Sequence, residues 1–214
     1  MRYTIAIVAA LSLSTVAFSQ VAATSPTNAV KKHLAVSAKR QAARMVPAAV
    51  VLDNDIDSAK VKRGAEFKTT LGDKVQLTDG PLLPKGTKLV GVVGQDDMNT
   101  PGTTKLSLRF TEAVLKNGTK IPIKATIITA YKLDDNSGGE GSGAGTASIP
   151  SSWNDGTLRV DQIGVEKGVD LHSRIASANS GTFVATSNHS VKLLQDSELA
   201  LALSARIPRT QIAK

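Results

Sequence analysis

Apolar and polar residues alternate along several short stretches of the chain from Ala48 onward. The clearest example is TKLSLRF at 104–110, in which every second residue is apolar: Leu106, Leu108 and Phe110. Successive side chains of a strand point to opposite faces of a sheet, so this pattern predicts a strand with one face in the core and one in water. The same reasoning predicts about nine strands: 48–55, 73–77, 87–93, 104–110, 120–131, 157–163, 181–187 and two within 189–204.

Turn-forming residues separate these stretches. The passage LTDGPLLPKGTKLVGVV at 77–93 contains DG at 79–80 and PKGT at 84–87, where glycine permits a positive φ and proline fixes the entry angle. NG at 117–118 is a strong hairpin signal. Gly91 lies inside an apolar stretch, where a glycine often marks a bulge or a close approach of two backbones. We therefore expect these residues to shape the backbone.

The strand pattern predicts an all-β fold, either a small β-barrel or a sandwich, formed by a single domain over 48–205. The stretch DDNSGGEGSGAGTAS at 134–148 has the composition of a flexible polar segment. We interpret it as a long loop that interrupts the domain or as a tether between two sheets of it. Residues 206–214 are expected to form a tail.

The N-terminus has the features of a cleavable export signal over residues 1–19, with a second possible cut near Ala23. Arg2 supplies a positive charge, an apolar run follows over 5–13, and small residues precede Gln20. The alternative is a membrane anchor, but the apolar run is shorter than the roughly 20 residues that span a bilayer. The chain has no cysteine, so disulfides and lipid attachment through cysteine are excluded. We expect a periplasmic or secreted protein without a membrane span in its mature form.

The net charge of +8 is concentrated between the signal and the β domain. Residues 51–214 carry 20 Lys or Arg and 18 Asp or Glu, a near balance. Residues 20–47 are interpreted as a linker followed by a basic arm, partly helical or disordered, which Pro47 would end. The arm contains no acidic residue and offers a possible contact with an anionic surface through five side chains: Lys31, Lys32, Lys39, Arg40 and Arg44.

Three aspartates at the start of the domain, Asp53, Asp55 and Asp57, resemble the beginning of a calcium loop. A helix-loop-helix calcium site would require glycine at Ser58 and glutamate at Gly64, so a solvated strand edge is the alternative that the sequence favours. We predict no metal site and no cofactor.

The sequence does not point to catalysis. The three histidines, His33, His172 and His189, have no zinc-motif spacing, and no GxSxG nucleophile elbow, P-loop or dinucleotide fingerprint is present. Only 3% of the residues are aromatic, which disfavours stacking platforms for single-stranded nucleic acid or sugar. Trp153 lies in a polar turn and either marks a contact surface or folds back onto the core. We therefore expect a protein that is not an enzyme and does not bind nucleic acid.

The passages GAEFKTTLGDKVQLTDGPLLPKGTKLVGVV and TKLSLRFTEAVLKNGTKIPIKATI resemble the C-terminal β-barrel domain of TrbI-type conjugal transfer proteins, which are subunits of type IV secretion core complexes. The LLPKGTKLVG passage is also similar to that of small exported proteins of unassigned function. The resemblance covers 64–130 well and 164–203 loosely. It implies an envelope barrel that acts through protein contacts, and its matched positions are backbone-shaping: Gly80, Pro84, Gly86, Gly91, Gly118 and Pro122.

These observations together predict an exported, non-catalytic β-domain protein with a structural or protein-interaction role at the bacterial cell envelope. The expected partners are envelope proteins and, through the arm, an anionic envelope polymer. The alternative is a β-barrel module that binds a small ligand, since small barrels can enclose one.

Overall fold

The computed structural model describes residues 42–131, 158–166, 168–185 and 190–206, and in this part of the chain the regular structure is almost entirely β-strand. The predicted signal, most of the predicted arm and the segment 134–148 lie outside the described residues. The strands are β1 (Val46–Leu52), β2 (Ile56–Asp57), β3 (Glu66–Leu71), β4 (Val75–Gln76), β5 (Leu82–Leu83), β6 (Lys88–Gly94), β7 (Lys105–Val114), β8 (Lys120–Tyr131), β9 (Arg159–Glu166), β10 (Val169–Arg174), β11 (Gly181–Ala185), β12 (Lys192–Leu193) and β13 (Glu198–Ala205).

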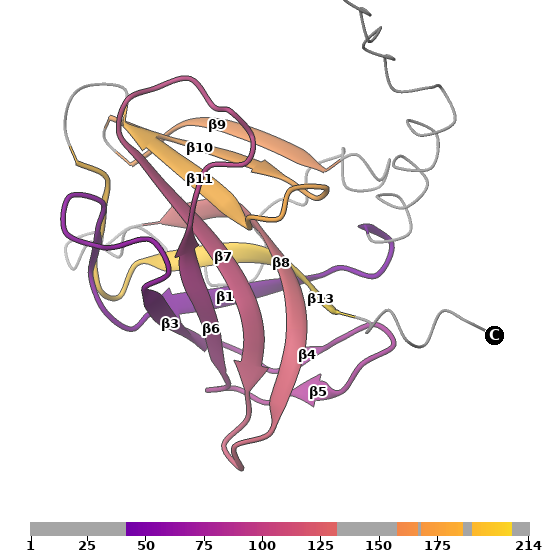
Figure 1. Cartoon of the computed structure of the whole chain (residues 1–214). Helices are drawn as coiled ribbons and strands as arrows, with labels where there is room; N and C mark the ends of the chain where they lie inside the picture. The colour runs from indigo at the N-terminus through magenta and orange to yellow at the C-terminus, as the bar shows by residue number, and fades with distance from the viewer. Residues whose placement is uncertain (1–41, 132–157, 167, 186–189, 207–214) are drawn as a thin grey trace, which may run out of the picture.

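Six strands close into an antiparallel barrel in the order β6-β3-β1-β13-β8-β7, because β6 pairs with β7 as well as with β3 (Figure 1). The prediction of an all-β fold is confirmed, and of the two predicted architectures the barrel is the one that forms. Two short two-stranded sheets, β2–β12 and β4–β5, lie outside the ladder of the barrel.

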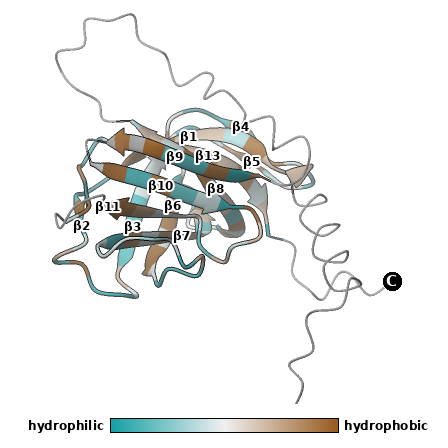
Figure 2. Ribbon diagram, turned by 90° about the horizontal axis from the view of Figure 1, so that it is seen from above, coloured by the Kyte–Doolittle hydropathy of each residue, from teal (hydrophilic) through white to brown (hydrophobic). Residues whose placement is uncertain are grey.

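The barrel wall continues into a second layer of three strands, β11, β10 and β9. Strand β7 makes this possible because it pairs with β11 near its start, at Leu106, and with β8 only near its end, at Ala113. Figure 2 shows β9, β10 and β11 side by side over one side of the barrel. Apolar side chains fill the space between β9 and the outer face of β8 and β13: Ala42, Met45, Ile128, Leu158, Val160, Ile175, Ala200 and Ala202.

Aliphatic side chains occupy the interior of the barrel. The inward residues of β7 are those that the alternation predicts, with Leu106, Leu108 and Phe110 all at most 2% exposed. Phe110 meets Phe67 edge to face, with ring centroids 5.1 Å apart. Leu199, Leu201 and Leu203 of β13 are fully buried in the same core.

Several details differ from the sequence-based expectations. Strands β3 and β10 were not predicted, and the predicted strand at 73–77 is reduced to the two residues of β4. Strand β1 begins at Val46 and includes Pro47, so the β structure starts within the range assigned to the arm. Ser107, predicted to face water, is 3% exposed, and its hydroxyl lies 2.9 Å from that of Thr182, its partner on the neighbouring strand β11.

Within the described ranges we find no helix long and apolar enough to cross a membrane.

Candidate functional site

A cleft of about 620 Å³ opens on the outside of the barrel where strand β2 separates from strand β3. Strands β1 and β3 are paired up to Leu52 and Thr69, and the last bond of this ladder runs from the Asp53 N–H to the Lys68 carbonyl at 3.0 Å. The chain then turns away, and Ile56 and Asp57 pair with β12. The cleft is the wedge between these diverging strands.

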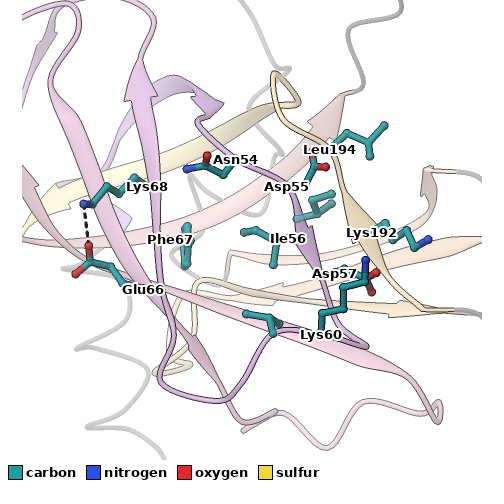
Figure 3. Close-up of a pocket in the computed structure, with 12 residues that line it drawn as sticks. Asn54, Asp55, Ile56, Asp57, Lys60, Glu66, Phe67, Lys68, Lys192 and Leu194 are labelled. Atoms are coloured by element: carbon teal, nitrogen blue, oxygen red, sulfur yellow. Dashed lines mark ion pairs between the residues drawn. The ribbon is translucent and has the colours of Figure 1, made fainter.

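The floor of the cleft is apolar and its rim is charged. Ile56, Phe67 and Leu193 are 5%, 6% and 2% exposed, and Figure 3 shows Ile56 and Phe67 pointing toward each other into the space between β2 and β3. Glu66 and Lys68 lie on the other side of β3, with a carboxylate–ammonium distance of 3.1 Å. The remaining lining residues are Asn54, Asp55, Asp57, Lys60, Val61, Lys192 and Leu194.

The three aspartates singled out from the sequence, Asp53, Asp55 and Asp57, each bind different partners and do not converge on one point. An Asp53 oxygen lies 2.8 Å from Lys88 Nζ, and the other accepts a hydrogen bond from the Thr70 hydroxyl. Asp55 accepts the Gln195 N–H at 2.6 Å, and Asp57 accepts the N–H of Ala59 at 2.9 Å. Among the described residues, no group of three or more His, Asp or Glu side chains is placed to hold a metal ion. The aspartates fix the local chain path that opens the cleft.

A second cleft, of about 590 Å³, lies beside the Asp53–Lys88 pair and includes Lys85, Gly86 and Asp196 in its lining. Some polar groups that line this cleft already bind one another, since Lys88 Nζ lies 2.7 Å from the Thr70 hydroxyl oxygen as well as close to Asp53.

Two neighbouring carboxylates tie the β6–β7 connection to the rest of the fold. Asp96 accepts hydrogen bonds from the backbone N–H groups of Met98 and Thr100, from the Thr100 hydroxyl and from Lys105 Nζ at 3.0 Å. Burial raises the pKa of Asp96, but these bonds outweigh that effect and lower the pKa to about 2. A carboxylate with so many donors organises a loop and has little capacity left for a ligand.

Asp97 connects the same loop to the β10–β11 connection. Its carboxylate accepts the Ser177 hydroxyl at 2.7 Å, the Ala178 N–H at 2.7 Å and the Asn179 amide at 3.0 Å. Burial raises the pKa of Asp97, and the hydrogen bonds from Ser177, Ala178 and Asn179 outweigh it, so the pKa lies below its usual value.

Lys124 is a buried amine beside this junction. Its ammonium group donates to the Ser177 carbonyl. Burial lowers its pKa to about 8. The negative charge of Asp97 raises this pKa, and the positive charges of Arg206 and Arg109 lower it. The amine therefore contributes to holding the β10–β11 connection against the barrel.

His172 is the histidine whose position the structure gives. It lies opposite Asp161 in the β9–β10 pair, and its Nδ1 is 2.9 Å from an Asp161 oxygen. The other oxygen is 2.5 Å from Arg159 Nε. Burial raises the pKa of Asp161, but the bonds from His172 and Arg159 hold it below its usual value. His33, His189 and Trp153 lie outside the described residues.

The backbone-shaping residues are distributed over the barrel and do not converge on one site. Gly86 and Gly118 have φ values of +81° and +82°, as expected for turns. In the turn at 79–80 the positive φ, +54°, belongs to Asp79, and Gly80 is required for space because a Cβ atom there would lie 2.9 Å from Leu77 Cβ. Pro84 accepts the Thr87 N–H at 3.1 Å. Pro122 lies in β8 opposite Glu112.

Gly91 faces Phe67 in the β3–β6 pair, and the pairing of β6 with β7 shifts register between Val90 and Gly91. The sequence-based interpretation of this glycine as a bulge or close-approach position is thus confirmed.

Of the basic side chains assigned to the arm, Arg44 is described, and its Nε lies 3.4 Å from an Asp79 oxygen. Ala42 and Met45 beside it are buried against the second layer. Lys31, Lys32, Lys39 and Arg40 lie outside the described residues.

The cleft itself was missed by sequence reasoning. Its walls come from 54–68 and 192–194, which are far apart along the chain, and its apolar floor looks like ordinary core sequence. The available signal was the run of three aspartates, which interrupts the strand pattern where the ladder opens.

Comparisons with known proteins found little at the sequence level. No protein family matches this sequence, and the search of curated proteins found no match. Among solved structures, the chain is similar to ComB10 of the Com type IV secretion system of Helicobacter pylori, with 12% sequence identity and a TM-score of 0.34. The alignment covers 77% of this chain and 89% of ComB10.

Proposed function

We propose that this chain is an exported, non-catalytic barrel protein that acts at the bacterial cell envelope through contacts with other proteins. The observation that carries the proposal is the filled barrel. The inward side chains of its strands form one continuous apolar core that includes Leu52, Leu89, Ile127 and Leu201, all at most 1% exposed. A ligand inside the barrel would need the space that these side chains occupy, so binding is assigned to the outer surface.

Three carboxylates that already bind partners within the fold support the same proposal. Asp96 and Asp97 are each bound by several donors from loops, and Asp53 is bound by Lys88 and Thr70. Groups used in this way stabilise the scaffold that presents the outer surface. That surface contains the β2–β3 cleft and, on β9, the side chain of Ile163, which is 89% exposed.

A photo-crosslinking amino acid placed at surface positions of the full chain, expressed in its own host, tests the proposal. We expect the protein in the envelope or secreted fraction and discrete crosslinked protein species from Lys192 or Ile163, but not from Lys116 in the β7–β8 hairpin. Absence of any crosslinked protein from a scan of exposed positions, or recovery in the cytoplasm, would overturn it.

A further inference from the structure

Two basic side chains of neighbouring strands face outward from the same part of the barrel wall. Arg109 of β7 is exposed and lies between Leu108 and Phe110, which enter the core, so it faces away from the core. Lys124 of β8 also lies between two core residues and faces outward, and its side chain is partly buried. The residues opposite them in the paired strands, Val92 and Ser204, carry no charge.

Arg206 joins them from the end of β13. Ser204 is the partner of Lys124, and the ladder continues beyond it, because the Arg206 N–H donates to the Pro122 carbonyl at 2.9 Å. Residues two apart along a strand share a face, so Arg206 is the diagonal neighbour of Lys124. Diagonal neighbours are about 7–8 Å apart, which long side chains can bridge.

Strands β7 and β8 separate beside Lys124. They are paired near the hairpin, from Glu112 to Val114, and beyond this ladder Ser180 lies between them. The Ser180 hydroxyl accepts the Phe110 N–H at 3.1 Å, and its carbonyl accepts the Ile127 N–H at 2.8 Å. The same β10–β11 connection shields Lys124, whose ammonium donates to the Ser177 carbonyl. A shielded ammonium therefore lies on β8, with an arginine on the strand at each side of it.

The charges of this cluster, defined as Arg109, Lys124 and Arg206, do not balance. Asp97 is the carboxylate that acts on the Lys124 ammonium, and the two arginines oppose it. Among the described residues, neither arginine has a carboxylate within 4.0 Å, and Glu112 of β7 is paired with Lys120 at 2.8 Å. Three positive charges against one negative charge leave two uncompensated.

A bound anion would offset the repulsion within the cluster. Like charges close to a desolvated ammonium are unfavourable, and an anion placed among them removes this cost. A guanidinium group binds phosphate with two parallel hydrogen bonds, and an ammonium adds a compact positive charge. A phosphate monoester carries about 1.5 to 2 negative charges at neutral pH, which matches the excess of the cluster.

We propose that Arg109, Lys124 and Arg206 bind a phosphate group, either as free phosphate or as a phosphate monoester on a lipid headgroup. The guanidinium groups bind its oxygens from the β7 and β13 sides, and the Lys124 ammonium lies between them. The inference goes beyond the proposed function and does not depend on it.

The test titrates the full chain, ¹⁵N-labelled in its arginine and lysine side chains, with inorganic phosphate at neutral pH and constant ionic strength. We expect the Nε–H signals of Arg109 and Arg206 to shift to saturation. The titration midpoint of the Lys124 amine should move to higher pH, because a bound anion favours the ammonium form.

Arg109→Gln together with Arg206→Gln should weaken phosphate binding about 10-fold, because charge-assisted hydrogen bonds are lost. Both residues are exposed, so the variant should fold as the parent does. The matched control, Lys74→Gln with Lys116→Gln, removes the same charge from the β3–β4 and β7–β8 connections and should bind as the parent does.

Lipid vesicles distinguish the two sources of the phosphate group. Phosphatidic acid has a terminal phosphate, whereas phosphatidylglycerol has a phosphodiester with one charge. If the source is a headgroup, the parent should prefer phosphatidic acid in phosphatidylcholine vesicles of equal total charge, and the double arginine variant should lose this preference. Binding of inorganic phosphate without a preference between the vesicles would identify free phosphate as the ligand.

Three results would overturn the proposal: no saturable shift at Arg109 and Arg206, the same shifts with chloride at equal ionic strength, or equal weakening in the lysine control. None of them would affect the proposed protein contacts, because the crosslinks from Lys192 and Ile163 do not involve the cluster. Conversely, a lack of crosslinked protein would leave the phosphate site in place.

Discussion

Phe67 occupies the space that any side chain at position 91 would need. The two residues face each other across the β3–β6 pair, and a Cβ atom on Gly91 would lie 2.6 Å from Phe67 Cε1 and 2.7 Å from the Arg109 carbonyl oxygen. The second contact is with backbone, which cannot rotate away. The aromatic pair of Phe67 and Phe110 therefore depends on the absence of a side chain in the neighbouring strand.

Gly91→Ala should lower the free energy of unfolding by about 1–3 kcal/mol, the usual range for forcing an extra carbon into a packed core. Gly72→Ala is the matched control, because a Cβ atom at Gly72 would meet its nearest atom, the Ala49 carbonyl oxygen, at 3.5 Å. Urea denaturation followed by circular dichroism measures both. Equal stability of the two variants would contradict the close-approach argument.

Gly118 is required for its backbone angle, since its φ is +82° and a Cβ atom there would meet nothing within 4 Å. Gly118→Ala should cost about 1 kcal/mol for the left-handed conformation, and Gly118→Asn should cost less because asparagine tolerates it. The difference between the two variants in thermal unfolding is the measurement. If alanine were as stable as asparagine, the strain would not lie in the backbone.

Asp96 makes the stability of the fold sensitive to acid. Its pKa is about 2 in the folded state and near 3.8 when unfolded, so its contribution is present above about pH 4 and is lost as the pH falls through 2. The contribution at neutral pH is about 2 kcal/mol, for a side chain that is 9% exposed. Asp96→Asn should remove this dependence, which denaturant unfolding between pH 2 and 6 would show. An unchanged pH profile in the variant would count against the assignment.

Lys124 should also make the stability of the fold rise with pH, but at alkaline pH. Its pKa is about 8 when folded and 10.5 when unfolded, so between these values the unfolded chain holds the extra proton and stability rises with pH. The rise should be about 3 kcal/mol in full, because burial accounts for most of the shift.

The Lys124→Met variant, which has no titrating amine at this position, is the control for this rise in stability. Subtracting its unfolding free energies from those of the parent between pH 7 and 10.5 isolates the lysine from the other titrating groups. A flat difference would show that the amine is already solvated in the folded protein.

The basic arm is proposed to contact an anionic envelope polymer through charge, and its test must spare the residues that belong to the fold. Ala42 and Met45 are buried, and Arg44 pairs with Asp79, so the variant should change only Lys31, Lys32, Lys39 and Arg40, each to Gln. We expect envelope association of the parent to fall with added salt and that of the variant to be weak at all salt concentrations. Salt-independent association of the parent would exclude this role.

Alternation in sequence identified the strands whose two faces differ in polarity. Strand β7 is an example, because Leu106, Leu108 and Phe110 enter the core, whereas the charged Lys105 and Arg109 lie on its other face. Strand β3 was missed because Thr69, which lies on an inward position, is polar, and its burial is compensated by a hydrogen bond from its hydroxyl to the Leu89 carbonyl. Ser107 and Thr182 are also polar and buried, on the neighbouring strands β7 and β11, and the hydrogen bond between their two hydroxyl groups compensates for their burial.

The candidate site was beyond sequence reasoning for a geometric reason. The cleft exists because Ile56 pairs with Leu193 while Phe67 stays with Gly91, and these pairings join segments distant in the chain. Local pattern reports which residues can form a strand, but it does not report where two paired strands separate. The aspartates near this point were assigned to a solvated edge, and their roles as acceptors for Gln195 and Ala59 depend on the same separation.

Strand β13 lies between β1 and β8, so the first and last long strands of the domain are neighbours in the barrel wall. A chain that leaves the ribosome, or passes through a pore, from its N-terminus cannot close the barrel until Ala205 has emerged. Until then the facing edges of β1 and β8 remain open together, and closure must join segments at opposite ends of the sequence, which slows folding. Strand β13 is therefore the strand that completes the barrel, and the wall has a gap between β1 and β8 until it is in place.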